Sequence, residues 1–460
     1  GSLVTFHPAS HCVHTAAAAS SAVSRGPRIE GTKSGESSTC STVSCGSGQW
    51  AARTGIYTVG RGNRGKAKFR KLEAASNQTA LSSESVTLAE VMKAAGYATA
   101  HFGKWHLGDQ ADRESPTDQG FDHQVGGDRR GGVGKLGNFA DEDGALPIPG
   151  MSANGRAGQF VADRLTDEAI GWLAGVEQAP AFCCVSHYSV HTPIQAPAAD
   201  LEATPAAPEG SRHRNRRYAA MLKNLDDNVG RVLDFLAAAE DPMRAGQKMI
   251  ENTVIVFTSD NGGLGGYRNA GVGSAPEVTE QSPLRSGKGS LHEGGVRVPF
   301  IVRWDDRVAP GGVDATPTQL FDLYPTLVAV AGGAVPDGHA VDGVDLSSRW
   351  RSADAAVSDR PLFWHFPGYL EASSRKGTWR TTPVSVVREG QLKAMFFYET
   401  RSWVLYDLAA DINESKDLSE ARPADLARLA STLCGWLDRT EALMPRDLDG
   451  GEVARPAAPQ

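Results

Sequence analysis

Apolar residues recur at helical spacing in the segment "TLAEVMKAAG", residues 87–96. One face of this segment carries Leu88, Val91, Met92 and Ala95. Thr87 and Glu90 have the spacing of a capping box, in which each side chain bonds the backbone N–H of the other residue. Gly96 is placed to end the helix. The pattern therefore predicts a short amphipathic helix with defined ends.

Two further segments show the same spacing of three to four residues between apolar side chains. The first carries Val161, Leu165, Ala169 and Trp172. The second is longer and carries Tyr218, Met221, Leu222, Leu225, Val229, Val232, Leu233 and Leu236. Both patterns predict amphipathic helices that bury one face against a core.

Short runs of β-branched and aromatic residues alternate with these helices. They are "YATAHFGKWHLG" (97–108), "AFCCVSHY" (181–188), "TVIVFTSDNGG" (253–263) and "VRVPFIVRW" (296–304). Such runs are typical of buried strands. Alternating helices and strands predict an α/β domain, and we expect residues 49–358 to form a large mixed β-sheet sandwiched by helices.

The pattern changes after about Asp359, where strands follow one another without intervening helices. "VSVVREGQLKAMFFYE" is expected to form a hairpin that turns at Glu389–Gly390, and "WVLYDL" a third strand. "ADLARLASTLCGWL" has the spacing of a closing helix. Residues 359–460 are therefore predicted to form a smaller C-terminal antiparallel-sheet subdomain with a terminal helix and tail.

The first 48 residues differ from the rest, because they are rich in Ala, Ser and Thr and have neither helical nor strand periodicity. We expect an irregular leader over residues 1–48. Its stretch "HTAAAASSAVS" is too polar for the apolar part of a signal peptide. No apolar run in the chain reaches the roughly 18 residues that cross a bilayer, so we do not expect a membrane-spanning protein.

Composition excludes some classes of function. The chain has 460 residues, 40% of them hydrophobic and 22% charged, which is ordinary for a globular protein. The formal net charge of −7 offers no general attraction for nucleic acid or an anionic membrane. Six cysteines, two of them adjacent, do not make a disulfide framework. Neither compartment nor oligomeric state can be predicted from these numbers.

Four polar clusters stand where predicted strands end or begin. They are Lys104 with His106, His191, Asp260 with Asn261, and Lys288. In an α/β sheet such positions converge on one edge, where ligands bind. Carboxylate and amide oxygens suit Ca²⁺ or Mg²⁺, whereas lysine and histidine neutralise a tetrahedral anion. Together the clusters predict a site for a metal ion and an anionic tetrahedral group.

Each cluster alone has a simpler interpretation. Taken alone, Lys104 is better explained as a surface lysine whose stem rests on Trp105. His191 before Thr-Pro is typical of a turn, as is the string "DNGG". His187 and His191 are a weak zinc pair, because their spacing falls on a strand and loop rather than on one helical face. The expected convergence of all four clusters on one sheet edge favours a shared metal and anion site over these simpler interpretations.

Several longer motifs carry a family resemblance. They are "LAEVMKAAGYATAHFGKWHLG", "SHYSVHTPIQAP", "YAAMLKNLDDNVGRVLDFL", "VIVFTSDNGG", "SPLRSGKGSLHEGGVRVPFIVRW" and "FDLYPTLVAVAG". In this order the chain resembles a type I, formylglycine-dependent sulfatase of the arylsulfatase kind, from about Gln49 to about Ser419. The resemblance implies an alkaline-phosphatase-like fold and hydrolysis of a small-molecule or glycan sulfate ester. It also implies a periplasmic or secreted location.

The resemblance assigns roles to the polar clusters. It implies that Asp260 and Asn261 bind Ca²⁺ or Mg²⁺. Lys104 and Lys288 would hold sulfate oxygens. His106 would assist turnover of a covalent intermediate, and His191 would protonate the leaving alcohol.

Two family motifs are missing from the N-terminal region. Residues 1–48 contain no Asp, so the adjacent aspartates that complete the metal site have no counterpart. No Cys-x-Pro-x-Arg or Ser-x-Pro-x-Arg motif, the source of the formylglycine nucleophile, is present at Cys40, Cys45 or Ser38. The nucleophile is therefore unassigned. We hypothesise that the leader is aberrant, through a frame shift or a wrong start, and expect the activity of this chain to be impaired.

Two alternatives stay open beside sulfate-ester hydrolysis. A phosphodiesterase or phosphonate hydrolase of the same superfamily would use a similar site for a tetrahedral anion and a metal. A protein that binds sulfate or sulfated glycans without turnover would keep the anion pocket but need no nucleophile.

Overall fold

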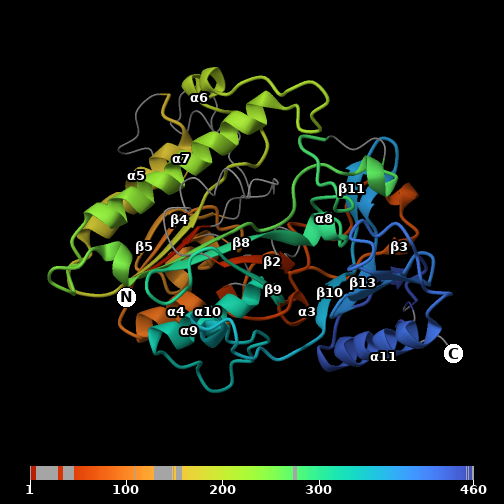
Figure 1. The fold of residues 1–460 in the computed structure, drawn as a ribbon. Helices are drawn as coiled ribbons and strands as arrows, with labels where there is room; N and C mark the ends of the chain where they lie inside the picture. Colours follow the sequence, from red (N-terminus) through yellow and green to blue (C-terminus); the bar gives the residue numbers. More distant parts are fainter. Residues whose placement is uncertain are drawn as a thin grey trace.

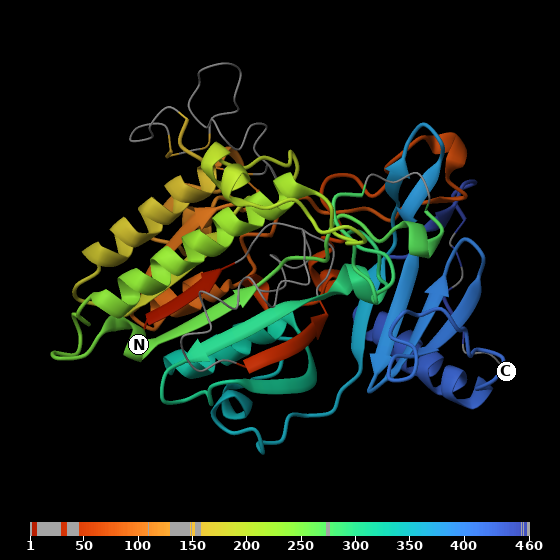
Figure 2. The ribbon, with the colours of Figure 1, turned by 45° about the horizontal axis from the view of Figure 1, so that its top comes forward.

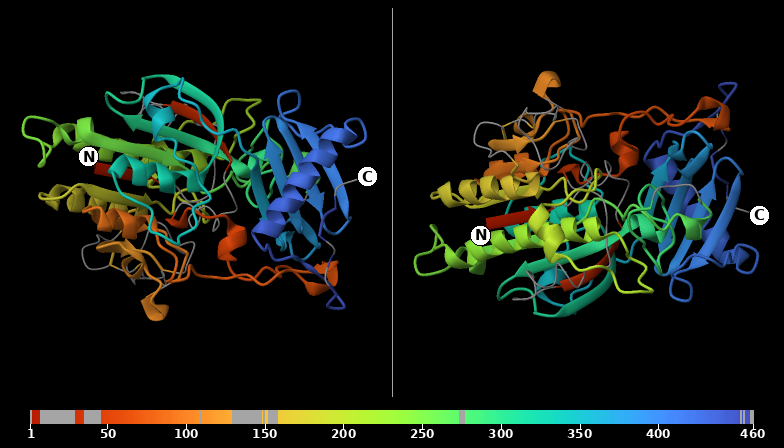
Figure 3. Two further views of the ribbon diagram at one scale, coloured as in Figure 1. Left: turned by 90° about the horizontal axis from the view of Figure 1, so that it is seen from below. Right: turned by 90° about the horizontal axis from the view of Figure 1, so that it is seen from above.

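The computed structural model describes residues 2–6, 29–34, 46–108, 110–128, 148, 150–151, 158–272, 277–451, 453 and 455–457. A large sheet covered by helices lies beside a smaller C-terminal sheet (Figure 1). Views along a perpendicular direction show the same two parts next to each other (Figure 3). No helix in the described ranges combines the length and apolarity needed to span a bilayer.

The large sheet has eight strands in the order β5-β4-β6-β1-β7-β8-β2-β9. Their bounds are β1 Ser2–Phe6, β2 Ile29–Ser34, β4 Ala98–Gly103, β5 His123–Gly126, β6 Ala181–Ser186, β7 Thr253–Thr258, β8 Arg297–Trp304 and β9 Gly312–Gln319. The strands from β5 to β7 are parallel, β8 is antiparallel to both β7 and β2, and β2 is parallel to β9. The predicted mixed sheet is confirmed.

The prediction of a wholly irregular leader is wrong for two segments. β1 lies in the middle of the sheet, where Leu3–Phe6 pairs with β6 and Ser2–Phe6 with β7. β2 lies between β8 and β9. Backbone pairing on both sides needs no periodicity in the strand itself, which is why composition failed to indicate these strands.

Helices cover both faces of the sheet, as predicted (Figure 1). One face carries α5 (Val161–Gly175), α6 (Ala198–Ala203) and α7 (Arg216–Ala238), and the other α4 (Leu88–Ala94), α9 (Leu323–Ala331) and α10 (Ser347–Arg351). Two separate apolar cores lie between the helices and the sheet. The helices predicted from apolar spacing correspond to α4, α5 and α7.

The capping box of α4 is confirmed in atomic detail. The Glu90 N–H donates to Thr87 Oγ1 at 3.1 Å, and the Thr87 N–H donates to Glu90 Oε2 at 2.7 Å. Gly96, with a φ of 86°, follows the helix end in the left-handed conformation that favours glycine. The local sequence therefore defines both ends of this helix.

The smaller sheet has the strand order β10-β13-β14-β15. Its elements are β10 (Leu362–Phe366), β13 (Val384–Glu389), β14 (Leu392–Phe397), β15 (Ser402–Asp407) and the helix α11 (Pro423–Arg439). Glu389 pairs with Leu392, so the predicted hairpin turns at Gly390 and Gln391. All of these elements follow residue 358, and the exact division of the chain there stays a prediction.

Short elements connect the two parts. They are α3 (Ala51–Thr54), α8 (Glu293–Val296), β3 (Leu72–Glu73) paired with β16 (Arg446–Asp447), the hairpin β11 (Leu370–Ser373) and β12 (Thr378–Thr381), and 3₁₀ turns at Ala67–Phe69, Gln110–Asp112, Pro116–Gln119, Met249–Asn252, Arg268–Ala270 and Leu320–Asp322. The segment with β3 lies beside β11, as Figure 2 shows. The segment that contains β3 thus packs on the C-terminal part of the chain.

A buried ion cluster joins α8 to the smaller sheet. Lys393 Nζ, on β14, lies 2.9 Å from Glu293 Oε1 and 2.9 Å from Glu414 Oε1. The side chains of Lys393 and Glu414 are 0% exposed and that of Glu293 is 1% exposed. Arg388 and His292 complete the cluster, which we call the interdomain ion cluster.

Candidate anion site

The predicted site residues lie at one edge of the large sheet. Lys104 follows β4 directly, His191 lies in the loop after β6, and Asp260 follows β7. Because β4, β6 and β7 run in the same direction, their carboxyl ends share this edge. Lys288 lies in the loop before α8 and β8, and β8 runs the opposite way and therefore starts at the same edge.

Backbone contacts place Lys104 in the interior. Its N–H donates to the carbonyl of Ser186 at 2.8 Å, which links the ends of β4 and β6. Gly103 has a φ of 101°, and a Cβ there would lie 2.1 Å from the same Ser186 oxygen, so glycine is required. Lys104 Nζ lies 3.0 Å from Asp260 Oδ2, and both side chains are buried. The interpretation of Lys104 as a surface lysine is wrong.

A glycine-lined loop holds Lys288. Its N–H donates to the carbonyl of Gly263 at 2.7 Å, and its carbonyl accepts from the Tyr267 hydroxyl at 2.9 Å. A Cβ on Gly287 would lie 2.1 Å from the Gly265 oxygen, so only glycine allows the two loops to approach. These contacts position the backbone from which the ammonium group extends.

The charge on Lys288 is destabilised by its surroundings. Burial lowers the pKa of Lys288 most, the charges of Lys104, Arg380 and Arg64 lower it further, and Asp260 opposes them. The result is a pKa of about 7 instead of 10.5. An anion bound beside this amine would stabilise its protonated form.

His106 is held neutral for the same reason. Burial, followed by the charges of Lys104 and Lys288, lowers the pKa of His106 to about 3. The residue has a φ of 66°, and its N–H donates to the carbonyl of Asp128 at 3.0 Å. Within the described part of the chain its Nδ1 is buried without a hydrogen-bond partner. A ring nitrogen is therefore left for a ligand.

His191 has a defined tautomer. Its Nδ1 lies 2.7 Å from the carbonyl oxygen of Thr192, and because a carbonyl can only accept, Nδ1 carries the hydrogen. Burial and then the charges of Lys288 and Lys104 lower the pKa of His191 to about 2. In the neutral ring Nε2 is thus the nitrogen that can take up a proton.

The charge balance of this edge indicates an anion rather than a cation. Lys104, Lys288, His106 and His191 influence one another electrostatically, and Asp260 is the acid that forms an ion pair with one of them. We call these five residues the anion site. Two lysines and two histidines are the chemistry expected around a tetrahedral oxyanion, and the pKa values of Lys288, His106 and His191 are lowered.

Among the described residues the donor set is incomplete for the metal ion that the resemblance implies. Asn261 Oδ1 is buried without a hydrogen-bond partner in the described residues, as a cation ligand would be. Asp260 Oδ2, however, is bound by Lys104. Ca²⁺ takes six to eight oxygens, and the described residues contain no group of three or more His, Cys, Asp or Glu side chains that could hold a metal. The weak zinc pair His187 and His191 likewise gains no third ligand there.

Asn261 also retains features of a polar turn. Its Nδ2 donates to the carbonyl of Gly262 at 2.8 Å, and the Ser259 hydroxyl donates to the carbonyl of Asn261 at 3.0 Å. The turn interpretation of "DNGG" therefore holds for the local backbone. Cys40 and Cys45, the cysteines nearest the missing nucleophile motif, lie outside the described residues.

Sequence reasoning missed two arginines near the site. The charges of Arg64 and Arg380 both reach Lys288 and lower its pKa. Arg64 Nε is paired with Glu371 Oε2 at 3.1 Å, and the Arg380 guanidinium lies 5.2 Å from the ring centroid of Tyr267. The two arginines are more than 300 positions apart in the chain. No local motif could have connected them, although a cluster of arginines in residues 61–70 was visible.

Sequence profiles of two families match the chain. The profile described as Sulfatase matches residues 11–334, and the profile described as N-sulphoglucosamine sulphohydrolase, C-terminal, matches residues 287–439. The first match begins inside the segment that was predicted to be an aberrant leader. Together the two profiles extend through most of the large sheet and the smaller one.

Curated relatives carry sulfatase names. The chain is 32% identical over 455 residues to a sulfatase of Formosa agariphila, which covers 86% of this chain and 78% of the relative. It is 29% identical to human arylsulfatase A, over 70% of this chain and 60% of that protein. The chain thus spans less than two thirds of the human relative.

Solved structures share the fold. Ps i-CgsB in complex with k-i-k-neocarrahexaose superposes with a TM-score of 0.72 at 21% identity, covering 95% of this chain and 92% of that one. A protein in complex with its substrate D-glucosamine-2-N,6-O-disulfate has a TM-score of 0.68 at 16% identity, with 96% and 98% covered. At these identities the likeness concerns the fold.

Proposed function

The chain belongs to the sulfatase family, and on that premise we propose that it binds a sulfate ester at the anion site and hydrolyses it. The observation that carries this proposal is the excess of basic over acidic side chains among the described residues at one sheet edge, where Lys104 and Lys288 lie near two neutral histidines, His106 and His191. A sulfate group would supply the negative charge that this cluster lacks. Binding would thereby relieve the repulsion that lowers the pKa values.

Each side chain has a proposed role. Lys104 and Lys288 bind sulfate oxygens through their ammonium groups. His191 donates the proton at Nε2 to the oxygen of the leaving alcohol, because its Nδ1 is already committed to Thr192. His106, with a free Nδ1 in the described part of the chain, assists proton transfer during turnover.

Anion binding and protonation are coupled in this proposal. In the empty site both histidines are neutral at physiological pH, because their pKa values are lowered to about 3 and about 2. A bound sulfate group offsets the charges of the two lysines, so it raises the pKa of His191 and favours the protonated form that a general acid requires.

The resemblance to sulfatases implies a metal ion and a formylglycine. The described residues complete neither site, so no proposed role depends on these groups. Asp260 and Asn261 remain the family's candidate metal ligands, and Asp260 in the proposal chiefly orients Lys104.

The test compares two esters on the whole chain. We expect 4-nitrophenyl sulfate to be hydrolysed faster than bis(4-nitrophenyl) phosphate. We expect His191→Gln to lose most activity on a sugar sulfate, whose leaving alcohol needs a proton, and to lose less on 4-nitrophenyl sulfate, while still binding inorganic sulfate. Faster hydrolysis of the phosphate diester would favour the phosphodiesterase alternative. Failure to bind inorganic sulfate at all would contradict the proposed function.

A second candidate function is sulfate or sulfated-glycan binding without turnover. The absence of any Cys-x-Pro-x-Arg motif from the sequence favours it. Co-expression with a formylglycine-generating enzyme separates the two candidates. An aldehyde at Cys40 or Cys45, detected by mass spectrometry together with new sulfatase activity, would exclude the binding protein. Tight sulfate binding with neither result would support it.

A further inference from the structure

A strongly basic segment extends away from the anion site. Residues 61–71, "RGNRGKAKFRK", contain six Lys or Arg residues and no Asp or Glu, in a chain whose net charge is −7. Arg64, in this segment, is close enough for its charge to lower the pKa of Lys288. Arg64 therefore places one residue of the segment near the anion site.

Packing holds this segment against the hairpin of β11 and β12. A Cβ on Gly65 would lie 2.5 Å from the ring of Trp379, and one on Gly377 would lie 2.5 Å from the ring of Phe69. Arg64 is paired with Glu371 of β11. These contacts make the segment a defined surface rather than a free loop.

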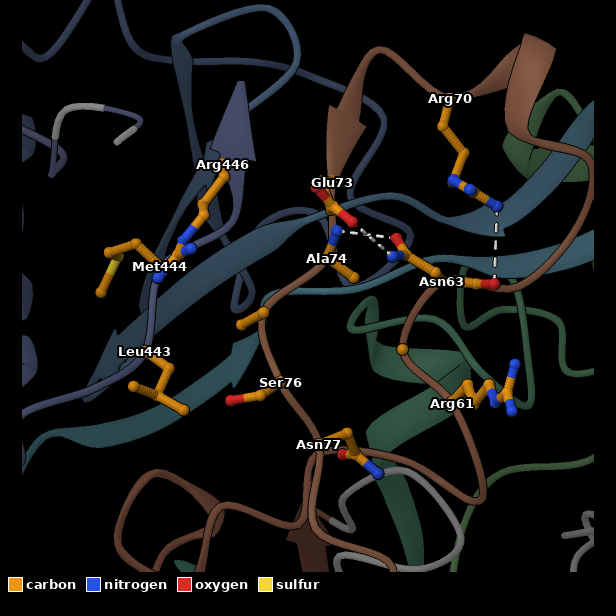
Figure 4. Close-up of a pocket in the computed structure, with 12 residues that line it drawn as sticks. Arg61, Asn63, Arg70, Glu73, Ala74, Ser76, Asn77, Leu443, Met444 and Arg446 are labelled. Atoms are coloured by element: carbon orange, nitrogen blue, oxygen red, sulfur yellow. Dashed lines mark hydrogen bonds between the residues drawn. The ribbon is translucent and has the colours of Figure 1, made fainter. Parts of the chain in front are cut away.

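A pocket of about 650 Å³ lies between this segment and the C-terminal strand β16 (Figure 4). Three arginines line it, Arg61, Arg70 and Arg446, and among its described lining residues Glu73 is the one acid. The volume lies within the range of ordinary ligand pockets, roughly 300–1,000 Å³. Its lining thus has a net positive charge.

Two of the three arginines are available to a ligand. Arg70 Nη1 donates to the backbone carbonyls of residues 63, 64 and 65, so Arg70 shapes the loop. Arg61 and Arg446 are exposed, and neither forms an ion pair or hydrogen bond through its side chain with any described residue. Both guanidinium groups line the pocket, from opposite sides in Figure 4, and guanidinium groups without a described partner are suited to bind sulfate or carboxylate groups.

We propose that the pocket of Arg61, Arg70 and Arg446 binds a second anionic group, a sulfate or carboxylate, of a polyanionic saccharide whose sulfate ester occupies the anion site. The first half of this statement, the pocket as an anion site, stands on the pocket's own residues, and the second half rests on the proposed function. Lys66 and Lys68, both exposed, would add electrostatic attraction for the saccharide.

A saccharide fits the lining better than a nucleic acid. Single-stranded nucleic acids are held largely by aromatic side chains that stack on the bases. The pocket is lined by arginines, by small or polar residues such as Asn63 and Ser76, and by the apolar Leu443 and Met444. No aromatic side chain is among its described lining residues. The pocket thus offers positive charges for anionic groups and polar side chains for hydroxyl groups, but no aromatic surface for stacking among its described residues. This combination matches a sulfated or carboxylated sugar.

The test measures binding of three probes by titration calorimetry to the full chain at low salt. A carrageenan hexasaccharide carries sulfates alone, a hyaluronan hexasaccharide carries carboxylates alone, and inorganic sulfate reports on the anion site. For Arg61→Gln/Arg446→Gln we expect at least about a tenfold loss of affinity for one or both hexasaccharides. Affinity for inorganic sulfate at the anion site, identified as the binding that Lys288→Met removes, should be unchanged. The hexasaccharide that loses affinity identifies which anion the pocket takes.

Two matched variants control for charge and folding. Arg244→Gln/Arg307→Gln removes two exposed arginines in turns before β7 and after β8, at the opposite edge of the sheet, and should leave all affinities unchanged. Arg61→Lys/Arg446→Lys keeps both charges and should restore most of the affinity.

Several outcomes would overturn the proposal. One is an equal loss of hexasaccharide affinity in the two Gln double variants, and another is no loss of affinity in Arg61→Gln/Arg446→Gln. A third is an oligodeoxynucleotide that binds as tightly as the hexasaccharides and depends equally on Arg61 and Arg446. Lys288→Met separates this proposal from the proposed function. If Lys288→Met no longer binds inorganic sulfate at the anion site but still binds a hexasaccharide through Arg61 and Arg446, two separate sites are supported. If the unmodified chain binds a hexasaccharide but never binds inorganic sulfate, the proposed function alone is overturned.

Discussion

The interdomain ion cluster and the anion site each contain a buried lysine, Lys393 and Lys104, yet the two sites differ in charge balance. Lys393 lies between two glutamates, Glu293 and Glu414, at 2.9 Å from each. Lys104 has one carboxylate partner, Asp260, while Lys288 lies near it with further positive charges around. One cluster is internally compensated and the other is left with excess positive charge.

Both pKa values are lowered, but the shift favours the charged form of Glu414 and disfavours the charged form of Lys288. In the interdomain ion cluster burial raises the pKa of Glu414, but the charges of Lys393 and His292 outweigh burial and lower it to about 2. In the anion site burial and neighbouring charges act together and lower the pKa of Lys288 to about 7. A compensated cluster stabilises the fold, whereas an uncompensated one is stabilised by a ligand that brings the missing charge.

The largest expected effect breaks the compensated cluster. Lys393→Met would leave Glu293 and Glu414 buried without their shared cation. We expect the free energy of unfolding, measured with urea, to fall by about 3–5 kcal/mol. Lys248→Met, which removes the exposed partner of Glu240, is the control and should cost less than about 1 kcal/mol. Similar small losses in both variants would show that the cluster is not structural.

A smaller effect is expected from the same change in the anion site. Lys288→Met removes a repelled charge and leaves no carboxylate unpaired, so the free energy of unfolding should not fall. Affinity for inorganic sulfate should decrease by roughly tenfold to a hundredfold, the loss of one charged hydrogen bond. Calorimetric titration with sodium sulfate measures it. Unchanged sulfate affinity would mean that Lys288 does not face the bound anion.

The smallest effect is a pH dependence of sulfate binding. Lys288 is protonated below its pKa of about 7, and a bound anion favours that protonated form. Affinity for inorganic sulfate should therefore be highest below pH 7 and fall, by at most about tenfold per pH unit, as the pH rises above 7. The histidines are neutral throughout this range in the empty site. In Lys288→Met the dependence should disappear, and its persistence would assign the titration to another group.

Local patterns explain how much of the fold was predictable. The capping box of Thr87 and Glu90, the apolar face of α7 and the hairpin around Gly390 each depend on residues a few positions apart. Neighbouring side chains contact one another in any conformation close to the native one, so spacing alone indicated these elements. β1 and β2 depend instead on backbone pairing with strands far away in the chain, which no local pattern records.

The candidate site likewise has features that the sequence predicted and features that it did not. The positions of Lys104, His191, Asp260 and Lys288 at strand ends were predictable, because strand direction brings such ends to one edge. The lowered pKa of Lys288 was not, because Arg64 and Arg380 approach it from separate elements. Likewise, the pocket between Arg61 and Arg446 exists only where β3 meets β16.

The sequence by itself determined which residue types stand at the sheet edge, and it determined that neither an aspartate pair nor a Cys-x-Pro-x-Arg motif precedes them. Only the tertiary structure decided how these charges are balanced. Asp260 is bound by Lys104, and Lys288 is left among positive neighbours. The reason is physical: charge interactions fall off with distance in space and are strengthened by burial, and the linear chain specifies neither quantity.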